Sequence, residues 1–342
     1  MKKIILILFV FRFSSLIFST QPILLPELLR PAKIEVGDDQ IYIIEDATIY
    51  VYSLETLMLK TKFGKKGEGP GEFPIGRHFN INMINIIPQK DKVIVNSRNK
   101  IIFFNKDGRF LSEKKTVQGF GSRILPFGNN YIGSQFTGFR QSEPAMAINI
   151  YDKDLNKLKE IFKVPVNFGG MMGRSNRKIN EFSSVFGYDT GNSRIYLFYS
   201  QDFLIDVLNS NGDNETSIKV DYRPVHISSD LKAKIMDYYE NVRYRNNWER
   251  VKNRIELPDR FPAIQSIKVR DGKIYVQTYK SKNGKCEFYI FNKAHKLEER
   301  VMAPLKKVNV REYFPYCIKN SKIYQVVEDE EGEDWHLLIN DI

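Results

Sequence analysis

One pattern recurs along the 342-residue chain and constrains its fold more than any other feature. Short runs of β-branched and aromatic residues alternate with turns, as in the stretch Lys92–Leu111, which reads KVIVNSRNKIIFFNKDGRFL. Such runs predict strands, and an Asp-Gly or Asn-Gly pair supplies the positive backbone angles of a tight hairpin. These pairs occur at Asp107-Gly108, Asn211-Gly212, Asp271-Gly272 and Asn283-Gly284. The chain is therefore predicted to be all-β.

The predicted strands group into units of four. Aligned on their second strands, six units place the following residues in equivalent positions: Tyr42, Ile94, Ile132, Tyr196, Tyr275 and Tyr324. The intervals are 52, 38, 64, 79 and 49 residues, and four strands repeating every 40–50 residues or so are typical of propeller blades. We therefore predict a six-bladed β-propeller with four-stranded antiparallel blades. The last unit shows three clear strands, so we expect residues near Gln21 to Arg30 to close the ring.

Two insertions explain the long intervals. The first, Val166–Phe182, is rich in glycine and basic residues. The second covers about residues 228–256 between blades four and five, and it is predicted to be helical from Ser229 to Arg243, with a second helix up to Val251. Either Ser228 or Ser229 can cap the helix. An apolar stripe at helical spacing is expected to pack on the propeller, and it comprises Leu231, Ile235, Tyr238, Tyr239 and Val242.

A glycine-rich stretch, Phe63–Pro74, reads FGKKGEGPGEFP. A phosphate-binding loop would need Gly-Lys-Ser/Thr entering a helix, whereas here the glycines lead into another strand. We interpret the stretch as a sharp crossing from the outer strand of one blade to the inner strand of the next. Together with the strands that follow it, this stretch resembles the NHL repeat. The chain as a whole resembles the exported six-bladed β-propeller proteins of Bacteroidetes-like bacteria, whose functions are largely unassigned.

The first twenty residues have the layout of a secretory signal. Lys2 and Lys3 form a positive region, Ile4–Phe11 is apolar, and Ser19 is a small residue for cleavage. Arg12 interrupts the apolar run, which is then too short to span a bilayer comfortably. We predict export to a periplasm or the cell exterior, with residues 1–20 as signal peptide and residues 21–342 as one propeller domain. The alternative is an uncleaved signal that anchors the protein. No later membrane span is expected.

Charge and reactive residues restrict the possible functions. The net charge is +11, from 52 Lys and Arg against 41 Asp and Glu, but the basic residues are scattered. No nucleic-acid-binding motif is present, so a nucleic-acid partner is not expected. Whether Cys286 and Cys317 form a disulfide is left open by the sequence. Among four histidines only His78 follows a crossing, and we predict no metal site, no cofactor and no catalytic residue. Four carboxylates are interpreted as turn residues that bond local amides, namely Glu45, Asp46, Asp189 and Glu328.

The functional prediction is a binding mouth. In a propeller, the crossings into inner strands and the loops after second strands surround the channel at one face. The residues expected there as ligand contacts are Arg77, His78, Arg98, Arg123, Arg174, Arg177, Arg260 and Tyr279. Arginine can grip carboxylate, phosphate or sugar hydroxyls in a fork. We therefore predict a monomeric, non-enzymatic binding or interaction module whose basic, aromatic-lined mouth takes an acidic, glycan or peptide ligand. The alternative is a metal-dependent propeller lyase or hydrolase.

Overall fold

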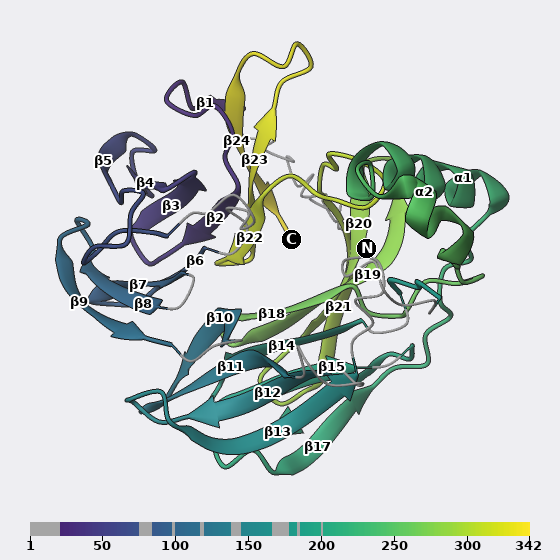
Figure 1. The fold of residues 1–342 in the computed structure, drawn as a ribbon, viewed down its shortest axis with the longest axis horizontal. Helices are drawn as coiled ribbons and strands as arrows, with labels where there is room; N and C mark the ends of the chain where they lie inside the picture. Colours follow the sequence, from purple (N-terminus) through teal and green to yellow (C-terminus); the bar gives the residue numbers. More distant parts are fainter. Residues whose placement is uncertain are drawn as a thin grey trace, which may run out of the picture.

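Six four-stranded antiparallel sheets form a ring of blades (Figure 1). The computed structural model describes residues 21–74, 84–97, 100–116, 120–137, 145–165, 178–182, 185–199 and 201–342. In blades one to five the strands follow one another in chain order from the innermost outward, and in blade six β22, β23 and β24 do the same, with β1 as the outermost strand. The prediction of a six-bladed propeller with four-stranded blades is confirmed.

The strands have the following bounds. Blade one contains β2 (Lys33–Val36), β3 (Gln40–Glu45), β4 (Thr48–Ser53) and β5 (Leu59–Phe63). Blade two contains β6 (Asn85–Pro88), β7 (Lys92–Ser97), β8 (Lys100–Asn105) and β9 (Phe110–Lys115). Blade three contains β10 (Phe120–Phe127), β11 (Asn130–Thr137), β12 (Ala145–Tyr151) and β13 (Lys157–Pro165). Blade four contains β14 (Phe186–Gly191), β15 (Arg194–Tyr199), β16 (Leu204–Leu208) and β17 (Asn214–Lys219). Blade five contains β18 (Ser266–Arg270), β19 (Lys273–Lys282), β20 (Lys285–Phe291) and β21 (Leu297–Pro304). Blade six contains β22 (Tyr316–Lys319), β23 (Lys322–Glu328), β24 (Trp335–Asp341) and β1 (Ile23–Leu24).

The alignment of the six units on their second strands is confirmed by the strand register. The aligned residues all lie in second strands, and all are buried. Their pairing partners on the inner strands are Glu35, Ile87, Leu125, Asp189, Lys268 and Cys317. These six partners form one layer around the channel, so equivalent positions in the sequence occupy equivalent positions in the ring.

The two ends of the chain close the ring, as predicted. Strand β1 pairs antiparallel with β24, placing Ile23 opposite Leu337. The N–H of Leu25 donates to the carbonyl of Trp335 at 2.8 Å, and the Trp335 indole donates to the carbonyl of Leu29 at 2.9 Å. Because Leu25 and Leu28 are also buried in the core beneath β24, the first residues of the propeller are held by the last blade.

The glycine-rich stretch after β5 is a structural crossing and not a phosphate loop. It leads Phe73 into the core between blades one and two, and the N–H of Gly67 donates to the Phe73 carbonyl at 3.1 Å. Gly64 has φ +96°, and a Cβ there would lie 2.5 Å from the Ala47 carbonyl oxygen. Glycine is therefore required where the chain leaves β5.

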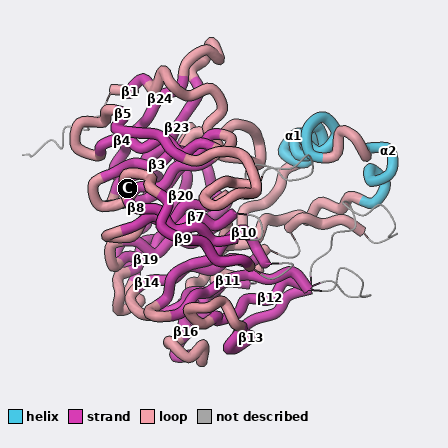
Figure 2. Tube along the Cα trace, turned by 60° about the vertical axis from the view of Figure 1, so that its left-hand side comes forward, coloured by secondary structure: helices cyan, strands magenta, loops and turns pink. Residues whose placement is uncertain are grey.

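The insertion between β17 and β18 forms α1 (Ser229–Tyr238), the π-helical turn η2 (Tyr239–Arg243), α2 (Trp248–Val251) and the 3₁₀ turn η3 (Lys252–Arg254). Ser228 is the N-cap, and its hydroxyl accepts from the N–H of Leu231. Ile235, Tyr238 and Tyr239 are buried as predicted. The prediction for Val242 is wrong, because the π-helical turn widens the last turn and leaves Val242 60% exposed. Figure 2 shows the helices projecting from one end of the ring.

Two further findings concern membranes and thiols. In the described residues, no helix has the length and apolar character needed to cross a bilayer. Cys286 and Cys317 are buried free thiols, and burial raises the pKa of both. The sequence left open whether these two cysteines form a disulfide, and in the structure they do not.

Candidate functional site: a charged cavity in the channel

The inner strands of all six blades line one cavity of about 470 Å³. This volume is within the range of about 300–1,000 Å³ that small-molecule sites occupy. The lining comes from the ends of the inner strands and the turns that follow them, including Gly37, Gln89 and Thr190. The mouth was predicted at the end of the channel where the chain crosses from blade to blade. The cavity lies at the other end of the channel.

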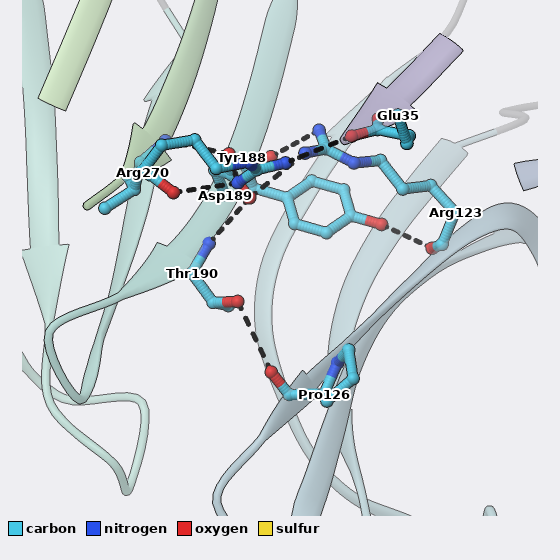
Figure 3. Close-up of polar contacts among 8 residues, drawn as sticks. Glu35, Arg123, Pro126, Tyr188, Asp189, Thr190 and Arg270 are labelled. Atoms are coloured by element: carbon cyan, nitrogen blue, oxygen red, sulfur yellow. Dashed lines mark hydrogen bonds and ion pairs between the residues drawn. The ribbon is translucent and has the colours of Figure 1, made fainter. Parts of the chain in front are cut away.

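Asp189 on β14 is the centre of the charged groups in this cavity. Its side chain is only 1% exposed. One carboxylate oxygen lies 3.1 Å from Arg123 Nη2 and the other lies 3.1 Å from Arg270 Nη1 (Figure 3). It also accepts the backbone N–H of Val269 at 2.9 Å. Burial by itself would raise the pKa of Asp189, but Arg270 and Arg123 outweigh it and hold that pKa below its usual value. Asp189 is thus an ionised bridge between two arginines.

This geometry corrects the interpretation of Asp189 as a turn residue bonded to local amides. The carboxylate does accept the N–H of Thr190 at 2.9 Å, but its other partners lie in blades three and five. Those partners are distant in sequence, so local sequence context could not reveal them. The same prediction is wrong for Glu45, which accepts the backbone N–H groups of Leu29 and Arg30, 16 and 15 residues earlier in the chain.

Both arginines are fixed by further contacts. Arg123 donates to the Tyr188 carbonyl at 2.6 Å, the Tyr188 hydroxyl donates back to the Arg123 carbonyl at 2.7 Å, and the guanidinium lies 5.3 Å from the tyrosine ring centroid. Arg270 donates to the carbonyl of Val269 and lies 3.9 Å from Glu35. Figure 3 shows these groups converging from blades one, three, four and five. The arginines therefore form a rigid positive wall.

Lys268 lines the same cavity as Arg123 and Arg270 but differs from them in its contacts. Among the described residues, no hydrogen bond or ion pair engages its ammonium group, although the residue is mostly buried and lines the cavity. Burial lowers the pKa of Lys268, and the charge of Arg123 lowers it further. The nearby Lys33 differs, since it donates to the Ile84 carbonyl and to Asn85 Oδ1, both at 2.7 Å. Burial lowers the pKa of Lys33 to about 8.

The cavity carries an excess of positive charge. Its basic lining residues are Lys90, Arg123, Lys268, Arg270 and Lys319, and its acidic lining residues are Glu35, Asp38 and Asp189. Lys319 is compensated, because it lies 3.2 Å from Asp38 and 3.1 Å from Asp271. Among the described residues, neither Lys90 nor Lys268 has a hydrogen-bond or ion-pair partner, and Lys268 is the less exposed of the two. An anion is the chemical complement of this arrangement.

The structure separates the residues that the sequence grouped as one mouth. Arg123 lines the channel cavity, whereas Tyr279 lines a second cavity beside the insertion and stacks on Phe261 at 4.6 Å. Arg260 is exposed and donates to the Pro224 carbonyl at 3.4 Å. The other five predicted contacts, Arg77, His78, Arg98, Arg174 and Arg177, lie outside the described residues. Ligand contact by any of the eight stays a prediction.

Four charged inner-strand residues were not predicted as site residues, although the sequence holds a signal for them: Lys33, Glu35, Lys268 and Arg270. The inner strands read KIEV in blade one and SIKVR in blade five, with charged and β-branched residues in strict alternation. This alternation indicates a strand with one polar and one apolar face. On the innermost strand of a blade, the polar face borders the channel.

No set of three or more His, Cys, Asp or Glu suited to a metal occurs within the described residues.

The fold and this cavity define a six-bladed β-propeller with a charged channel. The chain belongs to the family DUF5128, described as 6-bladed beta-propeller, whose model matches residues 26–208. No curated protein matches the chain.

The chain is similar to solved structures from Bacteroides. A protein from Bacteroides fragilis, named as a candidate exported protein, has a TM-score of 0.56 at 12% identity, with 94% of each chain covered. A member of the DUF4221 family from Bacteroides vulgatus has a TM-score of 0.49 at 10% identity, with 95% of this chain and 98% of that chain covered. At these identities the likeness concerns the fold alone.

Proposed function

We propose that this protein is an exported binding module that holds a small anionic ligand in the channel cavity. The observation that carries the proposal is Lys268, whose ammonium group lines a 470 Å³ cavity and forms no hydrogen bond or ion pair with any described residue. A buried charge without a partner is costly, and a bound anion would remove that cost. The ligand expected is a carboxylate or phosphate compound of small-molecule size, including an acidic sugar.

The neighbouring groups favour tight and selective recognition. Asp189 fixes Arg123 and Arg270 in place, so the ligand meets a preorganised positive surface and no long side chain has to be ordered on binding. Thr190 and Gln89 line the same cavity and can hydrogen-bond the neutral parts of a ligand. The cavity thus combines ammonium groups that pair with no described residue and neutral polar groups.

Export is part of the proposal. It is supported by the positive and apolar pattern of residues 1–20 and by the similarity to a Bacteroides structure that is named as a candidate exported protein. Intact-mass analysis of the protein recovered from the cell envelope or medium tests it. The expected mass is that of a chain cleaved near residue 20, and a full-length cytoplasmic chain would contradict export.

Titration calorimetry with citrate, galacturonate and inorganic phosphate tests the ligand-binding proposal. We expect at least one of these anions to bind, and we expect Lys268→Gln to weaken its affinity at least tenfold. Lys293→Gln, in an exposed turn of blade five, changes the net charge equally and serves as the matched control. Affinity should fall as the pH rises, because the pKa of Lys268 is lowered and the neutral amine no longer attracts an anion. Absence of binding by all three anions, or equal affinity in Lys268→Gln, would overturn the proposal.

A further inference from the structure

A second cavity, of about 200 Å³, lies at the crossing end of the ring beside the helical insertion. Its lining comes from the insertion, from the end of β19 and from the crossing between blades five and six. The lining residues used below are Leu231, Phe261, Tyr279, Lys280, Lys307 and Arg311. This cavity shares no lining residue with the channel cavity, so an inference about it does not depend on the function proposed above.

One wall of the second cavity is apolar and rigid. Val225 and Leu231 come from the insertion, and Val310 comes from the crossing. Phe261 and Tyr279 stack with ring centroids 4.6 Å apart and an interplanar angle of 3°. Phe182 packs edge-on against Phe261 at 5.1 Å, which fixes the stacked pair from behind. Such a wall favours an aliphatic or aromatic group.

The remaining lining of this cavity is polar and positive, with Lys280, Lys307 and Arg311. No described residue accepts or donates a hydrogen bond at the Tyr279 hydroxyl, which leaves that group available to a ligand. Lys280 and Arg311 are neutralised, because they lie 3.2 Å from Glu287 and 3.4 Å from Glu181. Lys307 has no carboxylate partner in the described part of the chain.

The contacts of Lys307 hold its ammonium group at the cavity. Its nitrogen lies 3.2 Å from Ser281 Oγ and 5.2 Å from the centroid of the Tyr313 ring. Both of these residues line the cavity, and no acidic residue is among the described residues that line it. Within the described part of the chain, Lys307 is therefore the cation of this cavity that has no carboxylate partner, and the same cavity has an apolar and aromatic wall.

We infer that this second cavity binds an apolar monocarboxylate, the chemistry of the carboxyl-terminal apolar residue of a peptide or of a small N-acyl amino acid. The volume is below the range of about 300–1,000 Å³ for whole small-molecule ligands, so it suits one residue-sized group. The apolar side chain lies against Leu231 and the stacked rings, and the carboxylate pairs with Lys307. The Tyr279 hydroxyl donates a hydrogen bond to the same carboxylate.

Ligand-observed NMR and calorimetry with matched acids and amides test this inference. N-acetyl-leucine and N-acetyl-phenylalanine are expected to bind at least tenfold more tightly than their carboxamides. Lys307→Ala should reduce the affinity for the acids about tenfold, whereas Lys306→Ala, one position away on the same exposed crossing, should leave it unchanged. Lys268→Gln should also have no effect, which separates this site from the channel cavity.

A second variant keeps the test independent of packing changes. Tyr279→Phe retains the stacking on Phe261 and removes only the hydroxyl, and it should weaken binding of the acids about fivefold. Leucine-terminated tetrapeptides with free or amidated ends identify the source of the ligand. Tighter binding of the free-ended peptide than of N-acetyl-leucine indicates a peptide end, and exclusion of the peptide indicates a small acid. Equal affinity for acids and amides, or unchanged affinity in Lys307→Ala, would overturn the inference.

Discussion

A single buried carboxylate organises the charged channel. Asp189 forms ion pairs with two guanidinium groups and accepts hydrogen bonds from two backbone amides, so its ionised form is satisfied on every side. Removal of one member of a buried charged network leaves the others without partners, and this loss is usually larger than the net contribution of the network. The consequence for this chain is that stability and cavity geometry depend on the same residue.

Asp189→Asn should destabilise the protein by about 2–4 kcal/mol, since it removes the carboxylate that pairs with Arg123 and leaves Arg270 with only Glu35, at 3.9 Å. The value is somewhat below that of fully buried pairs because both arginines keep partial exposure to solvent. Urea denaturation measures the change. Asp154→Asn removes an exposed carboxylate that pairs with Lys114 and should stay within about 0.5 kcal/mol of wild type.

An acid titration provides a second readout of the same residue. The pKa of Asp189 is lowered in the folded state, so its contribution to stability is complete above the pKa of the unfolded chain, about 3.9, and is lost as the pH falls below it. Wild type should therefore approach Asp189→Asn in stability under acid conditions. A constant difference between the two at all pH values would contradict the assignment.

At the scale of elements, the strands and hairpins could be predicted because their signals are local. Asp271 and Gly272 both have positive φ, as the predicted hairpin requires, and the second strands fall where the aligned tyrosines and isoleucines placed them. The channel charges could not be assigned in the same way. Arg123, Asp189 and Arg270 come together only when the ring closes, and nothing in a local window links positions some 66 to 81 residues apart. The sequence signal for these channel residues was the alternation of polar and β-branched residues in the inner strands KIEV and SIKVR.

The crossing after β5 gives a prediction for an element. Gly64→Ala should cost about 3 kcal/mol, because φ is +96° and the new Cβ would lie 2.5 Å from the Ala47 carbonyl oxygen and 2.6 Å from Phe73. Gly272→Ala is the matched control, since φ is +79° but no atom lies within 4 Å of a new Cβ. It should cost only about 1 kcal/mol, from the backbone alone. Equal losses of stability in the two variants, measured by urea denaturation, would argue against a steric role for Gly64.

At the scale of the whole molecule, the ring is closed by very little chain. Only Ile23 and Leu24 form the strand that joins the N-terminal end to blade six. Buried Leu25 and Leu28 and the Trp335 indole strengthen this junction. Blades one and six therefore share a core, and β1 supplies the outermost strand of blade six. A closed ring in which every blade packs on two neighbours should unfold as one unit.

Deletion of the chain up to Leu25 should break this cooperativity. The Trp248→Phe background leaves Trp335 as the single tryptophan, so its fluorescence reports on blade six, whereas far-ultraviolet circular dichroism reports on all blades. In the closed ring the two urea midpoints should coincide. In the deletion variant the fluorescence midpoint should come first, because blade six loses β1, the packing of Leu25 and the backbone bond to Trp335. Coincident midpoints in the deletion variant would show that the blades stay coupled without the closing strand.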